Sequence, residues 1–381
     1  MKVFVIQPNL SAKSEVWLFR MNQMISGNIC GIAAFMDKNE AINNSHVFNL
    51  NGRKPTFGER QLIRLRLLKY DFNNTMRREL LSTIKASRAD LIIVHYATTA
   101  HYLWVSLLEE LEQAIFIYVH GHDIIWDHKG SNGENLHPPS YLNEILSLSK
   151  KSNVNFIVSS DCSRRSLVSI GICENKIKKK VFGVDLPNPN KSLDNPELKV
   201  LFLGRFVDYK GPDVVLEAFI KACDLGFKGR LVMAGDGPLK SMCEIIARRS
   251  IYKDLITFTG AVSSEQAKEL YSSSDIYSMH NTKGILSNGY DTFGVTFIEA
   301  MSHGLSVVTS TEGGPSEIIE NGVDGILVQQ FNTEEHAKAF MLLYSNKDLR
   351  KGLGLNAREK VRTRYTSDIE KREFLDILGF V

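Results

Sequence analysis

The chain has 381 residues, more than one hydrophobic core ordinarily accommodates, so two domains are expected. Hydrophobic residues make up 43% and charged residues 23%, as in an ordinary globular protein, and no apolar run reaches the roughly 18 residues that span a membrane. The net charge of +3 comes without a dense basic stripe, which excludes a nucleic-acid-binding protein. The five cysteines are scattered without a CxxC spacing, which predicts reduced thiols, a cytoplasmic location and no metal site.

The first half of the chain alternates short apolar runs with amphipathic segments. Its opening run is brief and ends at Gln7-Pro8, which indicates a strand and not a signal peptide. Continuous apolar runs separated by helical patterns are typical of a parallel sheet that helices cover on both faces. The predicted strands are residues 3–6, 29–35, 91–94, 115–119 and 156–158.

Polar side chains follow several of these strands, where the binding residues of parallel sheets gather. The loop after the first strand carries Ser14 and Glu15 and leads into a helix. His95 follows the strand at 91–94, and His120 and His122 follow the strand at 115–119. A histidine at such a position either points into a cleft or has a structural role, and three of them at equivalent strand ends favour the cleft.

Two basic stretches lie in this half. Residues 53–78 hold eight Lys and Arg side chains among leucines. This pattern favours a solvated helix that covers the sheet, with an interfacial helix on a membrane as the alternative. The run from Lys178 to Lys180 is expected to be a solvated edge.

A polar, proline-rich segment runs from Pro187 to Pro196, so we place an interdomain linker at residues 187–198. The alternation restarts beyond it, which predicts a second doubly wound domain and an α/β chain with two Rossmann-like domains. The strands predicted there are residues 200–203, 231–234, 256–259, 276–279, 306–308 and 326–328, and a charged helix is predicted over residues 355–378.

Cations and glycines follow the strands of this second half. Gly204 opens a turn directly after a strand, and Arg205 and Lys210 can converge from it on a diphosphate. A pair of solvated surface cations is the alternative. Glycine turns follow two further strands, at residues 235–238 and 311–317. No pair of aspartates stands in a metal-binding context, so the cations are expected to take the place of a divalent metal.

The stretch from Gly289 to Gly304 sets Asp291 and Glu299 eight residues apart. Gly294 permits a close backbone approach, and Asp291 or Thr292 is the expected N-cap of a helix. The positive end of that helix attracts a phosphate or a polar ligand. Glu299, about two turns in, can accept hydrogen bonds from a vicinal diol such as a ribose. A capped surface helix with one solvated Glu is the alternative.

Together these motifs make the second half resemble the family-4 retaining glycosyltransferases of GT-B fold, a group 1 glycosyltransferase family. Six motifs stand in family order: GR-x4-KG (204–211), GDGP (235–238), F-x-G (258–260), D-x-FG-x4-EA (291–300), HGLSVV (303–308) and GG-x-x-E (313–317). In the first half SEVWL (14–18), HGHD (120–123), VSSDCSRRSL (158–167) and FGVDL (182–186) are similar to family segments but less specific.

The resemblance implies a cytoplasmic, metal-independent enzyme that needs no cofactor. It would transfer a sugar with retention from a nucleotide-diphospho-sugar, UDP-linked rather than GDP-linked, to a saccharide or lipid-linked acceptor in polysaccharide biosynthesis. Residues 1–186 would bind the acceptor, with possible peripheral contact to a membrane, and residues 199–355 would bind the donor. A helix within residues 356–381 would pack back on the N-terminal domain.

The resemblance also assigns roles by matching position. Arg205 and Lys210 would bind the diphosphate, Glu299 the ribose, and Asp291 and His120 the donor sugar. Further donor contacts are implied for Gly204, Gly235, Asp236, Gly237, Val262, Phe293, Gly294, Gly313 and Gly314, and acceptor contacts for Ser14, Glu15, His95 and His122.

Three departures from the family pattern are visible. Asp291 stands where the family usually has Glu, Met279-His280-Asn281 lacks the usual Pro-Ser, and residues 11–15 replace a glycine pair. Because Asp291 is one methylene short, a non-catalytic partner subunit of the same fold is an alternative, as is a sugar-nucleotide epimerase. Intact Arg205, Lys210 and Glu299 favour the transferase.

Overall fold

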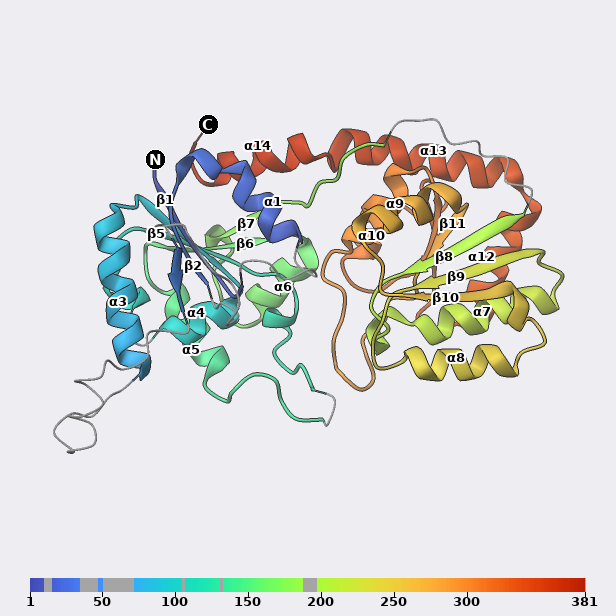
Figure 1. Ribbon diagram of the computed structural model, residues 1–381, viewed down its shortest axis with the longest axis horizontal. Helices are drawn as coiled ribbons and strands as arrows, with labels where there is room; N and C mark the ends of the chain where they lie inside the picture. Colours follow the sequence, from blue (N-terminus) through green and yellow to red (C-terminus); the bar gives the residue numbers. More distant parts are fainter. Residues whose placement is uncertain are drawn as a thin grey trace.

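The computed structural model describes residues 1–9, 16–34, 47–50, 72–104, 107–130, 133–187 and 197–380. Two α/β domains lie side by side, each built on one parallel sheet with helices on both faces (Figure 1). The prediction of two doubly wound domains is therefore confirmed.

The N-terminal sheet has the strand order β3-β2-β1-β4-β5-β6-β7, with every pair parallel. Its strands are β1 (Val3–Gln7), β2 (Ile29–Ala34), β3 (Val47–Asn49), β4 (Leu91–His95), β5 (Ala114–Tyr118), β6 (Val154–Val158) and β7 (Ile177–Lys179). The α-helices are α1 (Val16–Met24), α3 (Phe72–Ser87), α4 (Ala97–Trp104), α5 (Tyr141–Ser149) and α6 (Asp161–Ser169), and the 3-10 turns are η1 (Ser26–Asn28), η2 (Leu108–Glu110), η3 (His122–Ile124) and η4 (Glu174–Lys176).

The C-terminal sheet has the order β10-β9-β8-β11-β12-β13 and is also parallel throughout. Its strands are β8 (Leu198–Leu203), β9 (Gly229–Ala234), β10 (Ile256–Gly260), β11 (Ile276–Ser278), β12 (Ser306–Ser310) and β13 (Ile326–Val328). The helices are α7 (Pro212–Asp224), α8 (Lys240–Arg249), α9 (Ser264–Ser273), α10 (Val295–Ser302), α11 (Pro315–Ile318), α12 (Thr333–Ser345), α13 (Lys347–Arg364) and α14 (Ser367–Ile377), with 3-10 turns η5 (Asp208–Lys210) and η6 (Lys253–Leu255).

The central strands are buried along their whole length because both of their faces are covered. Every residue of β1 and β4 is buried, and so is every residue of β12. In each sheet the strand order reverses beside the first strand, between β1 and β4 and between β8 and β11. Ligands of open parallel sheets bind at such switch points, outside the carboxyl ends of the strands.

Three expectations about the elements were wrong. The edge strands β3 and β7 are three residues long and were not predicted, since so short a run carries little apolar signal. The single helix expected over 355–378 is two helices, because Thr366 accepts a hydrogen bond from the Ile369 N–H and starts α14. Lys180, expected on a solvated edge, is fully buried.

Helix α14 joins the two domains. The preceding helix α13 packs on α10 and β12 of the C-terminal domain, and α14 lies over the N-terminal domain (red in Figure 1). There Glu370 accepts hydrogen bonds from Lys180 Nζ at 2.5 Å, Arg20 at 2.8 Å and the Gly183 N–H at 3.0 Å. Burial lowers the pKa of Lys180 to about 8, although Glu370 acts to raise it.

Aromatic rings complete the surroundings of Lys180. Its ammonium lies 4.9 Å from the centroid of Phe182, 5.2 Å from Tyr118 and 5.4 Å from Phe374. Rings at these distances attract a cation through their negative faces, which offsets part of the cost of desolvation. The C-terminal helix is thus held to the N-terminal sheet by one buried, fully partnered charge pair.

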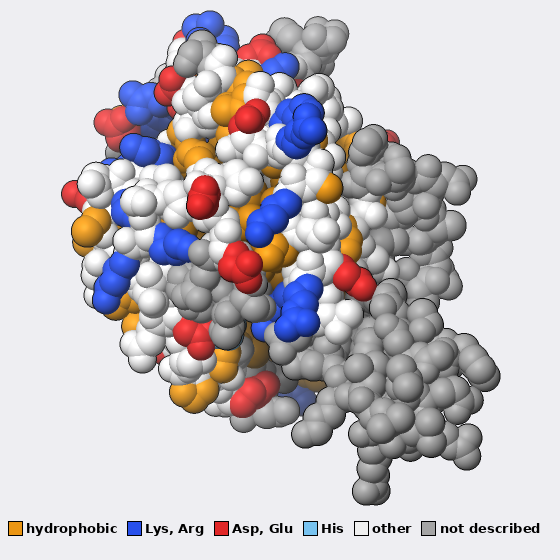
Figure 2. All heavy atoms as spheres, turned by 90° about the vertical axis from the view of Figure 1, so that its left-hand side faces the viewer, with side chains coloured by type: hydrophobic (Ala, Val, Ile, Leu, Met, Phe, Trp, Pro, Cys, Tyr) orange, Lys and Arg blue, Asp and Glu red, His pale blue; other side chains and the backbone are white. Residues whose placement is uncertain are grey.

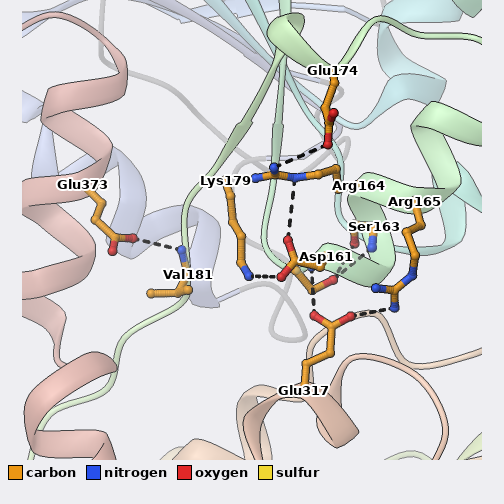
Figure 3. A network of polar contacts seen from close by, with 10 residues as sticks. Asp161, Ser163, Arg164, Arg165, Glu174, Lys179, Val181, Glu317 and Glu373 are labelled. Atoms are coloured by element: carbon orange, nitrogen blue, oxygen red, sulfur yellow. Dashed lines mark hydrogen bonds and ion pairs between the residues drawn. The ribbon is translucent and has the colours of Figure 1, made fainter.

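A second contact between the domains involves Glu317 of α11. Its carboxylate accepts hydrogen bonds from the Asp161 N–H at the start of α6 and from Arg165, both at 2.8 Å (Figure 3). A carboxylate at a helix N-terminus is favoured by the unpaired N–H groups there. Ser159, Ser160, Phe293 and Tyr365 line a small pocket beside this contact.

The outer end of the N-terminal domain has a mixed surface. Figure 2 shows Lys and Arg side chains interspersed with Asp and Glu over the described part of this face. Most of the basic stretch at 53–78 lies outside the described residues; Arg77, on α3, donates to the Tyr102 carbonyl and lies over the Tyr102 ring. No helix among the described residues has the length and apolar character required to cross a bilayer.

We expect Glu370→Gln to lower the free energy of unfolding by about 3–5 kcal/mol, because it leaves the Lys180 ammonium buried without a counter-charge. Glu373→Gln is the matched control. Glu373, on the same helix, accepts one hydrogen bond from the Val181 N–H, which a glutamine oxygen can still accept, so a loss below about 1 kcal/mol is expected. Urea unfolding measures both variants, and equal losses would contradict a special role for the buried pair.

Candidate functional site

The turn after β8 presents the two predicted cations. Gly204 follows the strand directly, and a Cβ at this position would lie 2.8 Å from Met279 Cε and in ordinary contact with the Lys210 stem at 3.5 Å. Arg205 is exposed; it donates a hydrogen bond to the Tyr209 hydroxyl and lies over the Tyr209 ring. Gly211 is left-handed and begins α7. Both cations therefore lie at the carboxyl end of β8, the first strand of the C-terminal sheet, at its switch point.

The GDGP turn after β9 packs against this turn. A Cβ at Gly235 would lie 1.9 Å from the Gly204 carbonyl oxygen, and one at Gly237 would lie 2.7 Å from the Phe206 carbonyl oxygen. Asp236 is exposed and accepts a hydrogen bond from the Gly237 N–H, while Val262 is half-buried after β10. The two glycines are thus required by the close approach of two backbones, and donor contacts for this turn stay a prediction.

Asp291 does not cap α10. Its carboxylate forms an ion pair with Lys210, with 2.7 Å between Nζ and Oδ2, and the Asn281 amide reaches the same oxygen at 3.3 Å. The N-cap of α10 is instead Gly294, which is left-handed. The expectation of an Asp291 or Thr292 cap was wrong because the loop turns Asp291 toward a cation that lies 81 residues away in sequence.

Glu299 lies half-buried on α10, at the same edge of the sheet. The Tyr271 hydroxyl of α9 donates to Glu299 Oε2 at 2.9 Å. Burial raises the pKa of Glu299, and the hydrogen bond from Tyr271 acts in the opposite direction. No described residue is shown donating to Oε1, so this oxygen can accept from a bound hydroxyl.

Gly313 and Gly314 hold the Asp291 loop in place. The Gly314 N–H donates to the Asp291 carbonyl oxygen at 2.8 Å, and a Cβ on Gly314 would lie 2.1 Å from the Thr292 carbonyl oxygen. Phe293 is buried, with its ring 5.3 Å from Phe182 of the N-terminal domain. The Gly314 N–H therefore stabilises the loop, and donor contacts for Gly313 and Gly314 stay a prediction.

The N-terminal domain contributes His120 from the end of β5. His120 Nε2 lies 3.1 Å from His95 Nδ1, and its ring centroid lies 4.0 Å from that of Trp17 and 4.4 Å from that of Tyr118. His120 Nδ1 is buried without a hydrogen-bond partner in the described structure. Burial lowers the pKa of His120 well below its ordinary value, with smaller contributions from His95 and Lys180.

Asp123 shapes the turn that presents His120. Its fully buried carboxylate accepts hydrogen bonds from the N–H groups of His120 at 3.0 Å, Gly121 at 2.8 Å and Ala97 at 2.8 Å. Gly121 has a φ of 133°, a conformation that favours glycine. Asp123 was not predicted as a site residue, although its position three residues after His120 is a readable signal for such a turn.

The domains meet where His120 and the Asp291 loop come together. The Thr292 hydroxyl lies 3.5 Å from the His120 carbonyl oxygen, and a Cβ at Gly121 would lie 2.9 Å from Thr292 Oγ1. His122 is exposed beside the Tyr96 ring. The structure thus brings His120 to the edge that carries Arg205, Lys210, Asp291 and Glu299.

The residues that are predicted to contact the acceptor lie in different environments. His95 is 1% exposed and lies behind His120, and burial lowers its pKa to about 3, with Lys180 contributing. Ser14 and Glu15 lie outside the described residues. Acceptor contacts for these residues stay a prediction, and the burial of His95 indicates a supporting position.

Sequence reasoning missed a polar chain behind β11. The Phe331 N–H donates to His280 Nε2 at 2.9 Å, so His280 Nδ1 carries the proton and donates to His336 Nδ1 at 2.8 Å. His336 Nε2 then donates to Ser278 Oγ at 2.7 Å. Burial lowers the pKa of His280 to about 4 and that of His336 well below its ordinary value. Since the His280 N–H donates to the Lys210 carbonyl oxygen at 3.2 Å, this chain supports the cationic turn.

Residues 188–360 match the family model described as Glycosyl transferases group 1. The second half of the chain is a group 1 glycosyltransferase domain. Among solved structures, Anabaena HepE in complex with UDP and glucose superposes with a TM-score of 0.74 and 16% identity over 100% of both chains. At this identity the likeness shows the GT-B fold alone, and it extends over both domains.

Curated relatives agree with this family assignment. The putative colanic acid biosynthesis glycosyltransferase WcaL of Escherichia coli is 25% identical over 301 residues, which are 76% of this chain and 70% of the relative. An uncharacterized glycosyltransferase of Methanocaldococcus jannaschii is 28% identical over 185 residues, 49% of this chain and 45% of its own. The match with the latter spans about half of either chain.

Acid should lower the free energy of unfolding of the glycosyltransferase domain, because it protonates the buried histidine chain. The folded state holds His280 neutral until about pH 4, whereas an unfolded histidine takes up a proton near 6.5, so stability present above 6.5 falls as the pH drops between these values. Replacing His280 by Gln should reduce the slope of unfolding free energy against pH in this window by about 1.4 kcal/mol per pH unit. Ser278→Ala, which removes a partner but no titrating group, should lower stability and keep the slope; an unchanged slope in His280→Gln would contradict the assignment.

Proposed function

We propose that this protein is a retaining glycosyltransferase that moves a sugar from a nucleotide-diphospho-sugar to a saccharide or lipid-linked acceptor. The observation that carries the proposal is the meeting of two sheet edges. Arg205, Lys210 and Glu299 of the C-terminal domain lie at one edge, and Thr292 brings that edge into contact with His120 of the N-terminal domain. Enzymes that join two substrates between domains need such an arrangement.

The donor site follows from these side chains. The Arg205 guanidinium provides a planar fork for phosphate oxygens, and the Lys210 ammonium acts as a point charge. The Glu299 oxygen that is not bonded to Tyr271 can accept from the ribose hydroxyls. UDP is the preferred nucleotide, supported by the UDP bound in the structurally similar HepE.

In the proposed reaction the bond between the anomeric carbon and the leaving phosphate oxygen breaks first. The acceptor hydroxyl attacks from the same face, and its proton passes to the departing diphosphate, so the configuration is retained. Arg205 and Lys210 stabilise the charge that develops on the leaving group, the kind of contact that commonly dominates catalysis. His120, kept neutral by burial, would contribute a hydrogen bond to the donor sugar and no charge.

The N-terminal domain would hold the acceptor. Its described strand ends carry His120 and His122, and His120 contacts Thr292 of the donor edge. A role in polysaccharide biosynthesis is supported by the printed function of the similar WcaL. A cytoplasmic location, with contact to the inner face of the membrane for a lipid-linked acceptor, completes the proposal.

Neutralising Lys210 should abolish most transfer. For Lys210→Met we expect the turnover number to fall roughly 100- to 1,000-fold, since one preorganised contact to the leaving group is lost. Lys240→Met is the matched control, because Lys240 pairs with Glu244 on the outer helix α8 and should keep full activity. Release of UDP from UDP-sugars in the presence of an acceptor measures both. Normal turnover of Lys210→Met would contradict the donor site.

Activity should persist in EDTA. Two cationic side chains neutralise the diphosphate in this proposal, so no divalent ion is required for the leaving group. In the described residues no cluster of three His, Cys, Asp or Glu side chains is arranged to hold a metal. The measurement is transfer by EDTA-treated protein with and without added magnesium or manganese. Loss of transfer that either ion restores would overturn the metal-independent mechanism.

A further inference from the structure

Asn281 occupies the switch point of the C-terminal sheet, three residues beyond β11. Its side chain is completely buried and uses both ends of its amide. Oδ1 accepts from the Thr309 hydroxyl at 3.2 Å, and Nδ2 donates to Asp291 Oδ2 at 3.3 Å. A carboxylate can only accept, so the amide nitrogen must face Asp291 and the orientation of Asn281 is determined. The Ser310 hydroxyl also donates to the Asn281 carbonyl oxygen, which holds the backbone.

Asp291 consequently has one occupied and one free oxygen. Oδ2 receives both Lys210 Nζ and Asn281 Nδ2. Among the described residues no donor to Oδ1 is shown. The carboxylate is 15% exposed and lies on the loop that touches His120, so Oδ1 is placed to accept from a hydroxyl of the donor sugar.

Under the proposed function, donor binding would change the partners of Oδ2. A diphosphate attracts Lys210, and as Lys210 turns to it the carboxylate loses its shorter hydrogen bond. The Asn281 amide cannot follow, because Thr309 and Ser310 hold it in the sheet. Asn281 is then the group that keeps the carboxylate plane in place while the sugar is bound.

We propose that Asn281 is a positioning residue that fixes Asp291 toward the donor sugar and thereby determines which sugar is transferred. This role rests on the proposed function. The side chains of Asn281 and Asp291 together span the gap between their two backbones, so that Asn281 Nδ2 reaches Asp291 Oδ2. A serine at 281 ends one bond earlier and cannot bridge the gap to Asp291, whereas a glutamate at 291 extends one methylene toward the space that a serine leaves.

The test is a double-mutant cycle of Asn281→Ser, Asp291→Glu and the combined variant, with UDP, UDP-glucose, UDP-N-acetylglucosamine and GDP-mannose as probes. Asn281→Ser should lower kcat/KM for the preferred donor roughly ten- to hundredfold, since a hydrogen bond to a charged group is lost. Its affinity for bare UDP, by calorimetry, should match that of the wild type, because UDP has no sugar to position. The ratio of kcat/KM among donors should become flatter.

Asp291→Glu should also lose activity. The combined variant should have a higher kcat/KM than either single variant, because the longer Glu carboxylate fills the space that Asn281→Ser leaves. Asn346→Ser is the matched control. Asn346 caps α13 far from the site, and serine caps as well, so its kinetics should be those of the wild type.

Four outcomes would overturn the role of Asn281. These are wild-type kinetics in Asn281→Ser, an unchanged donor preference, a parallel loss of bare UDP affinity, or strictly additive losses in the combined variant. A wild-type protein that binds UDP but transfers none of the three sugars would instead overturn the transferase, and the role of Asn281 would fall with it. Thermal unfolding of each variant separates these results from misfolding.

Discussion

The buried pair of Lys180 and Glu370 is the interaction on which the arrangement of the two domains depends. Each sheet by itself presents the carboxyl ends of its strands at one edge, but two such edges form a site only when they face each other. The chain crosses back from α13 to α14, and Glu370 binds Lys180, Arg20 and the Gly183 N–H on the N-terminal side. A buried charge with this many partners tolerates little displacement, because each lost partner leaves a desolvated ion.

Charge balance within the site follows the same principle on a smaller scale. Lys210 and Asp291 are 12% and 15% exposed and neutralise each other across 2.7 Å. Around them burial lowers the pKa of His120, His280 and His336, which disfavours the charged forms of these three histidines. Under the proposed function, a diphosphate that binds at this edge would draw Lys210 away from Asp291.

Much of the fold was predictable because it depends on short-range patterns. Apolar runs in buried parallel strands and glycines at strand ends are local signals, and the turn that presents Arg205 and Lys210 spans only eight residues. What failed depends on distant partners or on weak signals. Lys180 was expected in solvent because its partner lies 190 residues away, and Asp291 was expected to cap a helix because Lys210 lies 81 residues away. The edge strands β3 and β7 are too short for periodicity to detect.

The departures from the family pattern can be related to one another only in the three-dimensional structure. Along the chain, Asp291 in place of Glu and the absence of Pro-Ser from Met279-His280-Asn281 are two separate irregularities. In the structure Asn281 contacts Asp291, and the backbone N–H of His280 supports Lys210, so both changes act on one group of three side chains. Changes at touching positions are not independent, because the energy of each depends on the shape of the other. A single unusual residue at a site is therefore weak evidence for lost activity when a neighbouring side chain contacts it, as Asn281 contacts Asp291.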